Sequence, residues 1–200
     1  RHPTMVIGII VLVLMGLMAG LAPVLFTSDP VRADPFVRLQ PPSSEHWFGT
    51  DFVGRDAYSR TLYGSRVSLL VGFSVALICV TSAVIIGLVV GYYRLVDAVV
   101  MRVMDGLMAI PTILLAIALM ATLGGSVQNV IIAISVVETP RAVRVVRSVV
   151  FGLRDLTYVE AARAIGASTP RILFRHIFPG TVPAVIVQGT FICAAAILVE

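Results

Sequence analysis

Side chains that commonly perform catalysis or bind metal ions are few in this sequence and lie far apart. It has three histidines, His2, His46 and His176, and two cysteines, Cys79 and Cys193, each cysteine within an apolar run. Neither metal-ligand spacing nor a nucleophile beside a base occurs, so we expect both cysteines to serve packing. The chain also has no lysine, which a Gly-rich phosphate loop ending in Gly-Lys-Ser/Thr requires. We therefore expect a chain without catalytic residues, metal or cofactor that does not itself hydrolyse ATP.

Glu138 is an ionisable residue that follows an apolar run beginning near Val130. Inside a bilayer such a group is costly and usually faces a cavity or a partner. Two interpretations stay open. Glu138 lines a translocation path, or it pairs with Arg141 or Arg144 at the inner boundary of a span.

Two further residues are candidates for a path. Pro111 would kink its helix, although membrane helices often carry prolines for packing reasons alone. Gln188 is a polar residue within an apolar run, although single polar residues more often satisfy local helix contacts.

A charged segment, residues 154–178, interrupts the apolar sequence, and we expect it to be a surface that binds another protein. We call it the elbow segment. Thr157 and Glu160 have the spacing of a capping box, and the short helix after them can end at Gly166 in a left-handed conformation.

A second helix is predicted directly after that glycine. Ser168 or Thr169 can cap it, and Pro170 fits its first turn, where a missing N–H costs nothing. The pattern predicts two short helices at an angle, with an exposed Ala161-Ala162 face suited to a partner's cleft.

The elbow segment resembles a known motif. Glu160-Ala161-Ala162, then Gly166 after three residues, and Pro179 thirteen residues further on are similar to the EAA loop of ABC-importer permeases, the membrane subunits that dock onto cytoplasmic ATPases. His176-Ile177-Phe178-Pro179 replaces the Ile-x-Leu-Pro of that family and keeps the proline in register.

A second motif narrows the resemblance. Residues 48–60, with Phe48-Gly49-Thr50-Asp51, Gly54-Arg55-Asp56 and Ser59-Arg60, and residues 62–69 resemble the C-type permease of the dipeptide/oligopeptide/nickel branch. The resemblance runs from about Phe48 to the end of the chain.

The resemblance implies an all-α polytopic membrane protein with the ABC type I importer permease fold. It implies peptide import, with nickel chelates or glutathione-like solutes as alternative cargo. It also implies a sister permease in a heterodimer, two cytoplasmic ABC ATPase domains that bind ATP-Mg, an extracytoplasmic solute-binding protein, and the bacterial cytoplasmic (inner) membrane as the location.

The coupling residues that the resemblance assigns are Glu160, Ala161, Ala162, Arg163, Gly166 and Pro170. Rival hypotheses are a non-transporting membrane scaffold and an ion-coupled secondary transporter that uses Glu138.

Composition independently predicts a membrane protein. Hydrophobic residues make up 58% of the chain and charged residues 13%, about half the usual charged share of a soluble domain. Residues 5–26 carry no charge, and at about 1.5 Å per residue they cover the ~30 Å hydrocarbon core. We favour an uncleaved first helix, residues 1–26, over a cleaved signal peptide, because this run is long and more spans follow.

The remaining spans follow from the other apolar runs. A permease core, residues 67–200, is predicted to hold spans at about 67–93, 99–123, 127–149 and 177–199. Gly124-Gly125-Ser126 supplies the turn that divides a long uncharged run, and Ala83, Gly87 and Gly91 form a small-xxx-small packing face. Five spans are thus visible, and the resemblance implies a sixth helix in a longer protein.

Arginine predicts the orientation. The stretch 140–178 holds seven arginines against Asp155 and Glu160, whereas the loop 27–66 balances five arginines with five acids. The positive-inside rule therefore places the elbow segment, the N-terminus and a short connection 94–102 in the cytoplasm. Topology and anionic headgroups explain the net charge of +4 better than nucleic acid does.

The outer loop, residues 27–66, is predicted to be irregular from Ser28 to Ser44 and to form a short helix over residues 56–62 with an Asp56–Arg60 pair. Trp47 and Phe48 suit a membrane interface. The loop can be a lid or anchor, or part of a platform for an external binding protein.

Overall fold

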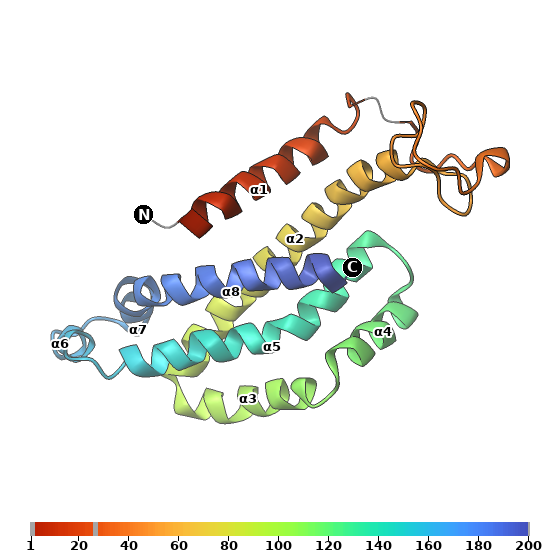
Figure 1. Cartoon of the computed structure of the whole chain (residues 1–200). Helices are drawn as coiled ribbons and strands as arrows, with labels where there is room; N and C mark the ends of the chain where they lie inside the picture. The colour runs from red at the N-terminus through yellow and green to blue at the C-terminus, as the bar shows by residue number, and fades with distance from the viewer. Residues whose placement is uncertain (1–2, 26–27, 200) are drawn as a thin grey trace. The chain divides into compact units, whose positions relative to one another are not determined.

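The computed structural model describes residues 3–25 and 28–199, and its regular elements are helices (Figure 1). They are α1 (Pro3–Leu21), the short 3-10 helix η1 (Pro35–Val37), α2 (Ala57–Tyr92), α3 (Arg94–Met108), α4 (Thr112–Leu123), α5 (Val127–Leu153), α6 (Thr157–Ala164), α7 (Thr169–Arg171), the π-helical turn η2 (Ile172–Ile177) and α8 (Phe178–Val199). The chain divides into two compact units, residues 1–70 and 71–200.

The first unit contains α1, the outer loop and the beginning of α2. Residues 28–56 are largely irregular, as the proline and polar composition predicts. The short helix expected over residues 56–62 is wrong in its extent, because α2 begins at Ala57 and continues without interruption to Tyr92. Asp56 precedes that helix, and its side chain accepts the backbone N–H of Ser59 at 2.7 Å, which stabilises the first turn.

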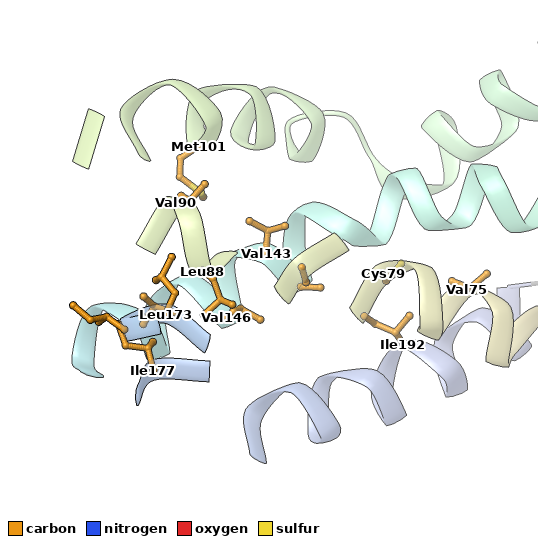
Figure 2. Packing of buried hydrophobic residues seen from close by; sticks show 14 of the residues in the cluster. Val75, Cys79, Leu88, Val90, Met101, Val143, Val146, Leu173, Ile177 and Ile192 are labelled. Carbon is orange, nitrogen blue, oxygen red and sulfur yellow. The ribbon is translucent and has the colours of Figure 1, made fainter. Parts of the chain in front are cut away.

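In the second unit α5 packs against α8 and against both α3 and α4 (Figure 1). Its core is built mainly from Val, Ile, Leu and Ala side chains of α2, α5, α6, η2 and α8, with Cys79 of α2 and Met101 of α3. Figure 2 shows Val143 and Val146 of α5 facing this cluster together with Val75 and Cys79 of α2 and Ile192 of α8.

The predicted small-residue face of α2 packs closely against α5. Ala83 is buried, and a Cβ placed on Gly87 would lie 2.7 Å from the Cβ of Val146. At Gly91 the corresponding distance to the Cβ of Val150 would be 2.5 Å. Small residues at this spacing therefore let the two helices approach each other.

The expectation of a single helix over residues 99–123 is wrong. The chain is helical from Arg94, so residues 94–102 are not a simple connecting loop, and the helix breaks before Pro111. The axes of α3 and α4 differ by 87°. Pro111 cannot donate a backbone hydrogen bond and disfavours helical geometry in the residue before it, so a break lies here rather than a mild kink.

By length and composition, two helices of the described chain can cross a membrane, residues 57–92 and 169–199. The bent α3–α4 pair makes a third if it counts as one span. This is fewer than the five spans expected. The apolar part of α1 over Val6–Leu21 is shorter than a full span, and α5 carries Glu138, Arg141, Arg144 and Arg147 along its length.

The last helix also begins earlier than expected. Residues 169–199 form one helix that includes the π-helical turn η2, so its start lies at Thr169 and not near Ile177.

Candidate functional site: the elbow segment and its anchors

The first arm of the elbow segment is α6. The capping box expected from Thr157 and Glu160 is wrong, because Leu156 is the N-cap residue and no side chain caps the helix. Glu160 lies in the first turn, where its negative charge is favourable near the positive end of the helix dipole.

Gly166 terminates α6 as the sequence predicts. Its φ is +82°, and the next residue, Ala167, donates its N–H to the Ala162 carbonyl at 3.0 Å. The Gly166 N–H donates to the Arg163 carbonyl at 3.1 Å, which completes a Schellman motif. A Cβ at Gly166 would meet nothing within 4 Å, so only the backbone conformation favours glycine here.

The second arm begins at Ser168 and has Pro170 in its first turn, as expected, although no side chain caps it. It is not a short separate helix, since it continues into α8. The elbow segment is therefore one short helix and a glycine turn joined directly to the last long helix.

The two faces of α6 differ in burial. Val159 and Ala162 are buried, whereas Glu160, Ala161 and Arg163 are exposed. The expectation of an exposed Ala161-Ala162 pair is thus wrong for Ala162. Val159 and Ala162 lie three residues apart on one helix face and belong to the same apolar cluster as Leu173 and Ile177 of η2 (Figure 2 labels the latter two).

Two arginines attach the elbow segment to the end of α2. Arg154 donates from Nη1 to the Gly91 carbonyl at 2.8 Å, and Arg163 donates from Nη2 to the Tyr92 hydroxyl at 3.2 Å. The guanidinium of Arg154 also stacks on the Phe151 ring, 4.3 Å from its centre. These contacts satisfy a carbonyl at a helix C-terminus and give the segment polar anchors as well as an apolar one.

Two ion pairs join α3 to α5. Arg147 donates to both carboxylate oxygens of Asp97, with Nη2 to Oδ2 at 2.6 Å, and Arg144 donates to Asp105 at 2.6 Å. Sequence reasoning missed these pairs, because residues 97 and 147 are far apart in the chain. The available signal was that Asp97 and Asp105 lie eight residues apart, on one face of a helix.

The candidate path residues lie in different surroundings. Glu138 is buried, and Arg141 donates to its Oε2 at 3.3 Å, which is one of the two pairings considered for it, while Arg144 instead binds Asp105. Pro111 lies at the α3–α4 break. The Gln188 side-chain nitrogen is buried and has no hydrogen-bond partner among residues 3–25 and 28–199.

The outer loop is held by its own carboxylates. The Asp56–Arg60 ion pair expected from sequence is wrong: Arg60 binds Asp51 at 3.1 Å, and Asp56 binds the His46 ring at 3.1 Å. Burial raises the pKa of Asp56, but hydrogen bonds from the Ser59 hydroxyl and N–H and from His46 outweigh it, so the pKa lies below its usual value.

Asp51 is held in a similar way. The Arg55 N–H, which donates to Oδ1 at 2.9 Å, lowers the pKa of Asp51, while burial opposes this effect. The Val53 N–H and the charges of Arg60 and Arg55 lower that pKa further. Trp47 and Phe48 are exposed and contact the Tyr58 ring, with ring centres 4.9 Å and 5.3 Å apart.

Comparisons with known proteins give a match to one family model. Residues 83–198 match the family described as the binding-protein-dependent transport system inner membrane component. The match begins at Ala83 in α2, so it includes the whole small-residue face of that helix, and it covers α3 to α7, η2 and nearly all of α8, with the entire elbow segment.

Curated relatives match along the chain. It is 50% identical to a probable peptide ABC transporter permease protein of Sinorhizobium fredii over 200 residues, which is 100% of this chain and 68% of that protein. It is 44% identical to a dipeptide transport system permease protein of Alkalihalophilus pseudofirmus, covering 99% of this chain and 66% of the relative. A glutathione transport system permease protein of Pectobacterium atrosepticum is 40% identical over 94% of this chain and 62% of its own length. The chain therefore belongs to the binding-protein-dependent transport system inner membrane component family, as a non-catalytic permease component of an ABC transporter.

Proposed function

We propose that this chain is the peptide-importing permease subunit of an ATP-driven transporter and that the elbow segment couples it to the ATPase. The observation that carries the proposal is the two-sided structure of α6. Its buried face is part of the helical core, while its other face presents Glu160, Ala161 and Arg163 to a partner.

The contacts between the elbow segment and the long helices can transmit movement from a partner. Val159 and Ala162 pack into the cluster that α5 and α8 share, and Arg154 connects the segment to the carbonyl of Gly91 in α2. Movement of an ATPase cleft around α6 therefore moves the membrane helices with it, because packed interfaces respond as rigid bodies. Gly166 and Pro170 set the angle between the two arms.

The partners follow from the family. A binding-protein-dependent component works with an ATPase and a solute-binding protein, and we infer two ATPase domains and a sister permease that completes the path. The arginines of residues 140–178 support a cytoplasmic elbow segment, and we infer a cytoplasmic N-terminus and an external outer loop with it. The outer loop then faces the binding protein.

Peptides are the proposed cargo. Several relatives along the whole chain carry peptide or dipeptide transport in their names, and these include the Sinorhizobium protein at 50% identity. A glutathione-type cargo is the alternative, since a glutathione permease is 40% identical. Glutathione is itself a peptide, so both cargoes present amide groups and charged ends.

Gly166→Val tests the coupling role. A β-branched residue at φ +82° is strained, and no neighbour lies within 4 Å of the new Cβ, so the change disturbs the turn without creating a clash. We expect peptide uptake into proteoliposomes that hold the whole transporter to fall at least about tenfold, which corresponds to roughly 1.4 kcal/mol.

Gly166→Asn is the matched control, because asparagine tolerates the left-handed conformation and should retain most of the uptake. Both variants should insert in the membrane at the level of the unmodified protein. Normal uptake by a stably inserted Gly166→Val protein would disprove the coupling role.

Affinity purification of the tagged full-length protein from gently solubilised native membrane tests the assignment as a whole. Mass spectrometry should identify an ATPase, a sister permease and a solute-binding protein in the complex. Recovery of the chain without an ATPase would contradict the proposal.

A further inference from the structure

A cavity lies in the second unit between α4, the N-terminal half of α5 and the end of α8. It has a volume of about 540 Å³ and an almost entirely apolar lining that includes Ile117 and Met120 of α4 and Ala133 of α5. This volume falls within the range of about 300–1,000 Å³ that is usual for small-molecule sites. Figure 1 shows α4 beside this half of α5.

A smaller cavity of about 40 Å³ adjoins the first, because Ile113, Ala116, Ile134 and Val199 line both. Its lining also contains the ionisable residue Glu138. We call these two adjacent cavities the chamber; their lining is largely apolar, and Glu138 belongs to the lining of the smaller one.

The Glu138 carboxylate has a single ion-pair partner among the described residues. The residue is 7% exposed, and among the described residues only Arg141 reaches its carboxylate, through Oε2 at 3.3 Å. The Arg141 side chain is 47% exposed, so its guanidinium has room to turn away from Glu138. A buried carboxylate needs a positive partner, and the one present is loosely held.

The geometry points to a cargo site in this chamber, in which Glu138 binds the α-ammonium group of a peptide and the apolar walls receive its side chains. This site rests on the proposed function and names the group of the cargo that the permease recognises. In the absence of cargo Arg141 neutralises Glu138, and the cargo ammonium replaces it.

The chamber selects among ligand classes. A neutral apolar ligand would fill the walls and leave Glu138 with Arg141, while an anionic ligand would be repelled by the carboxylate. A peptide with a free N-terminus supplies both an apolar body and a cation. A charge-assisted hydrogen bond is stronger than one between neutral groups, so loss of the ammonium should weaken binding measurably.

Equilibrium dialysis with the complete permease–ATPase complex tests this site. The complex is placed in nanodiscs of phosphatidylglycerol, which has no ammonium group, and the solute-binding protein is omitted because it makes its own selection. The probes are radiolabelled alanyl-leucine and N-acetyl-alanyl-leucine. We expect the unmodified complex to bind the free-amine peptide at least about tenfold more tightly than the acetylated one.

Three variants then distinguish recognition of the peptide ammonium by Glu138 from a purely structural role of the Glu138–Arg141 pair. Glu138→Gln should bind both peptides with the weak affinity of the acetylated probe, whereas Arg141→Gln should bind the free-amine peptide as tightly as before or more tightly. Ala116→Leu, which narrows both cavities, should weaken both peptides alike. If Glu138→Gln does not assemble, the acetylated probe, Arg141→Gln and Ala116→Leu still decide the question.

Equal binding of the two peptides to the unmodified complex would overturn the inference, as would an unchanged preference in Glu138→Gln. Loss of free-amine binding in Arg141→Gln would also overturn it, since the pair would then be structural. Phosphatidylethanolamine added to the nanodiscs should not compete, and strong competition would identify the occupant as lipid.

Failure of this inference is distinguishable from failure of the proposed function. A complex that imports peptide with its binding protein and ATPase but shows no ammonium preference contradicts only the site. A complex that imports no peptide contradicts the proposed function itself.

Discussion

The elbow segment and the outer loop are both polar, yet different interactions hold them in place. The outer loop satisfies its acids locally: Asp29, Asp34, Asp51 and Asp56 each accept a backbone N–H from a residue two to four positions further on. The elbow segment depends on partners far away in sequence, as when Arg154 binds the carbonyl of Gly91.

This difference indicates what each segment can do. A loop that satisfies its own polar groups can keep its shape while its surroundings change, which suits a surface that meets an external protein. A segment whose stability depends on α2, α5 and α8 cannot move without them, which suits a coupling element.

The largest effect should come from the packing on which the elbow segment depends. Gly91→Leu would place a side chain 2.5 Å from the Cβ of Val150 and 3.2 Å from the Arg147 carbonyl oxygen. We expect a loss of about 3 kcal/mol or more, because overpacking moves α2 away from α5 and removes the acceptor geometry for Arg154. Size-exclusion chromatography and thermal unfolding of the purified protein measure this loss.

Gly106→Leu is the matched control for that change. It lies on α3, and a Cβ there meets nothing within 4 Å, so the same substitution should have little effect. Trp47 fluorescence should report an intact outer loop in both variants, since this is the sole tryptophan of the chain. A Gly91→Leu protein as stable as Gly106→Leu would contradict the dependence of the elbow segment on α2–α5 packing.

A smaller effect is expected from the polar anchor. Arg154→Gln removes the bond to the Gly91 carbonyl and the stacking on Phe151, and should destabilise the elbow segment by about 2 kcal/mol. Hydrogen exchange of the α6 amides should become faster while that of residues 28–56 stays unchanged. Arg94→Gln, at an exposed arginine on α3, should leave hydrogen exchange in both regions unchanged. If the α6 amides exchanged equally fast in Arg154→Gln and Arg94→Gln, Arg154 would not be a specific anchor of the elbow segment.

Local rules predicted the turns of this protein well. Gly166 and Pro170 were identified correctly, because a left-handed terminus and a first-turn proline depend on one or two residues. The Gly124-Gly125-Ser126 turn follows the same logic, since Gly124 has φ +87° and the Ser126 hydroxyl caps α5 by accepting the Asn129 N–H.

Features that depend on distant residues could not be predicted in this way. Ala162 is buried in an apolar cluster that also contains residues of α2, α5 and α8, and the Arg147–Asp97 pair needs the α3–α5 contact to exist first. In the outer loop the four-residue spacing of Asp56 and Arg60 predicted an ion pair that does not form, for a related reason. Asp56 lies before the helix, so the i,i+4 rule does not apply, and Arg60 pairs with Asp51 instead.

The smallest effect should come from acidifying the outer loop. The pKa of Asp56 is lower in the folded loop than its usual value of 3.8, so its ionised form stabilises the loop above about pH 4. That stabilisation is lost as the pH falls through the folded pKa. Trp47, whose ring lies 4.9 Å from Tyr58, should therefore change its fluorescence at a pH below 3.8, while the hydrogen exchange of α6 does not follow the same transition.

Asp56→Asn should weaken the loop at pH 7 by about 1 kcal/mol, because the Ser59 N–H and hydroxyl then bond a neutral acceptor, and it should reduce the acid transition. Asp51, whose pKa is also lowered, accounts for the part of the transition that remains. Glu45→Gln, an exposed acid of the same loop, is the control and should leave the transition in place. If α6 and Trp47 lost their native signals together on acidification, the outer loop and the elbow segment would unfold as one cooperative unit, and the contrast between a self-contained loop and a core-dependent elbow would be wrong.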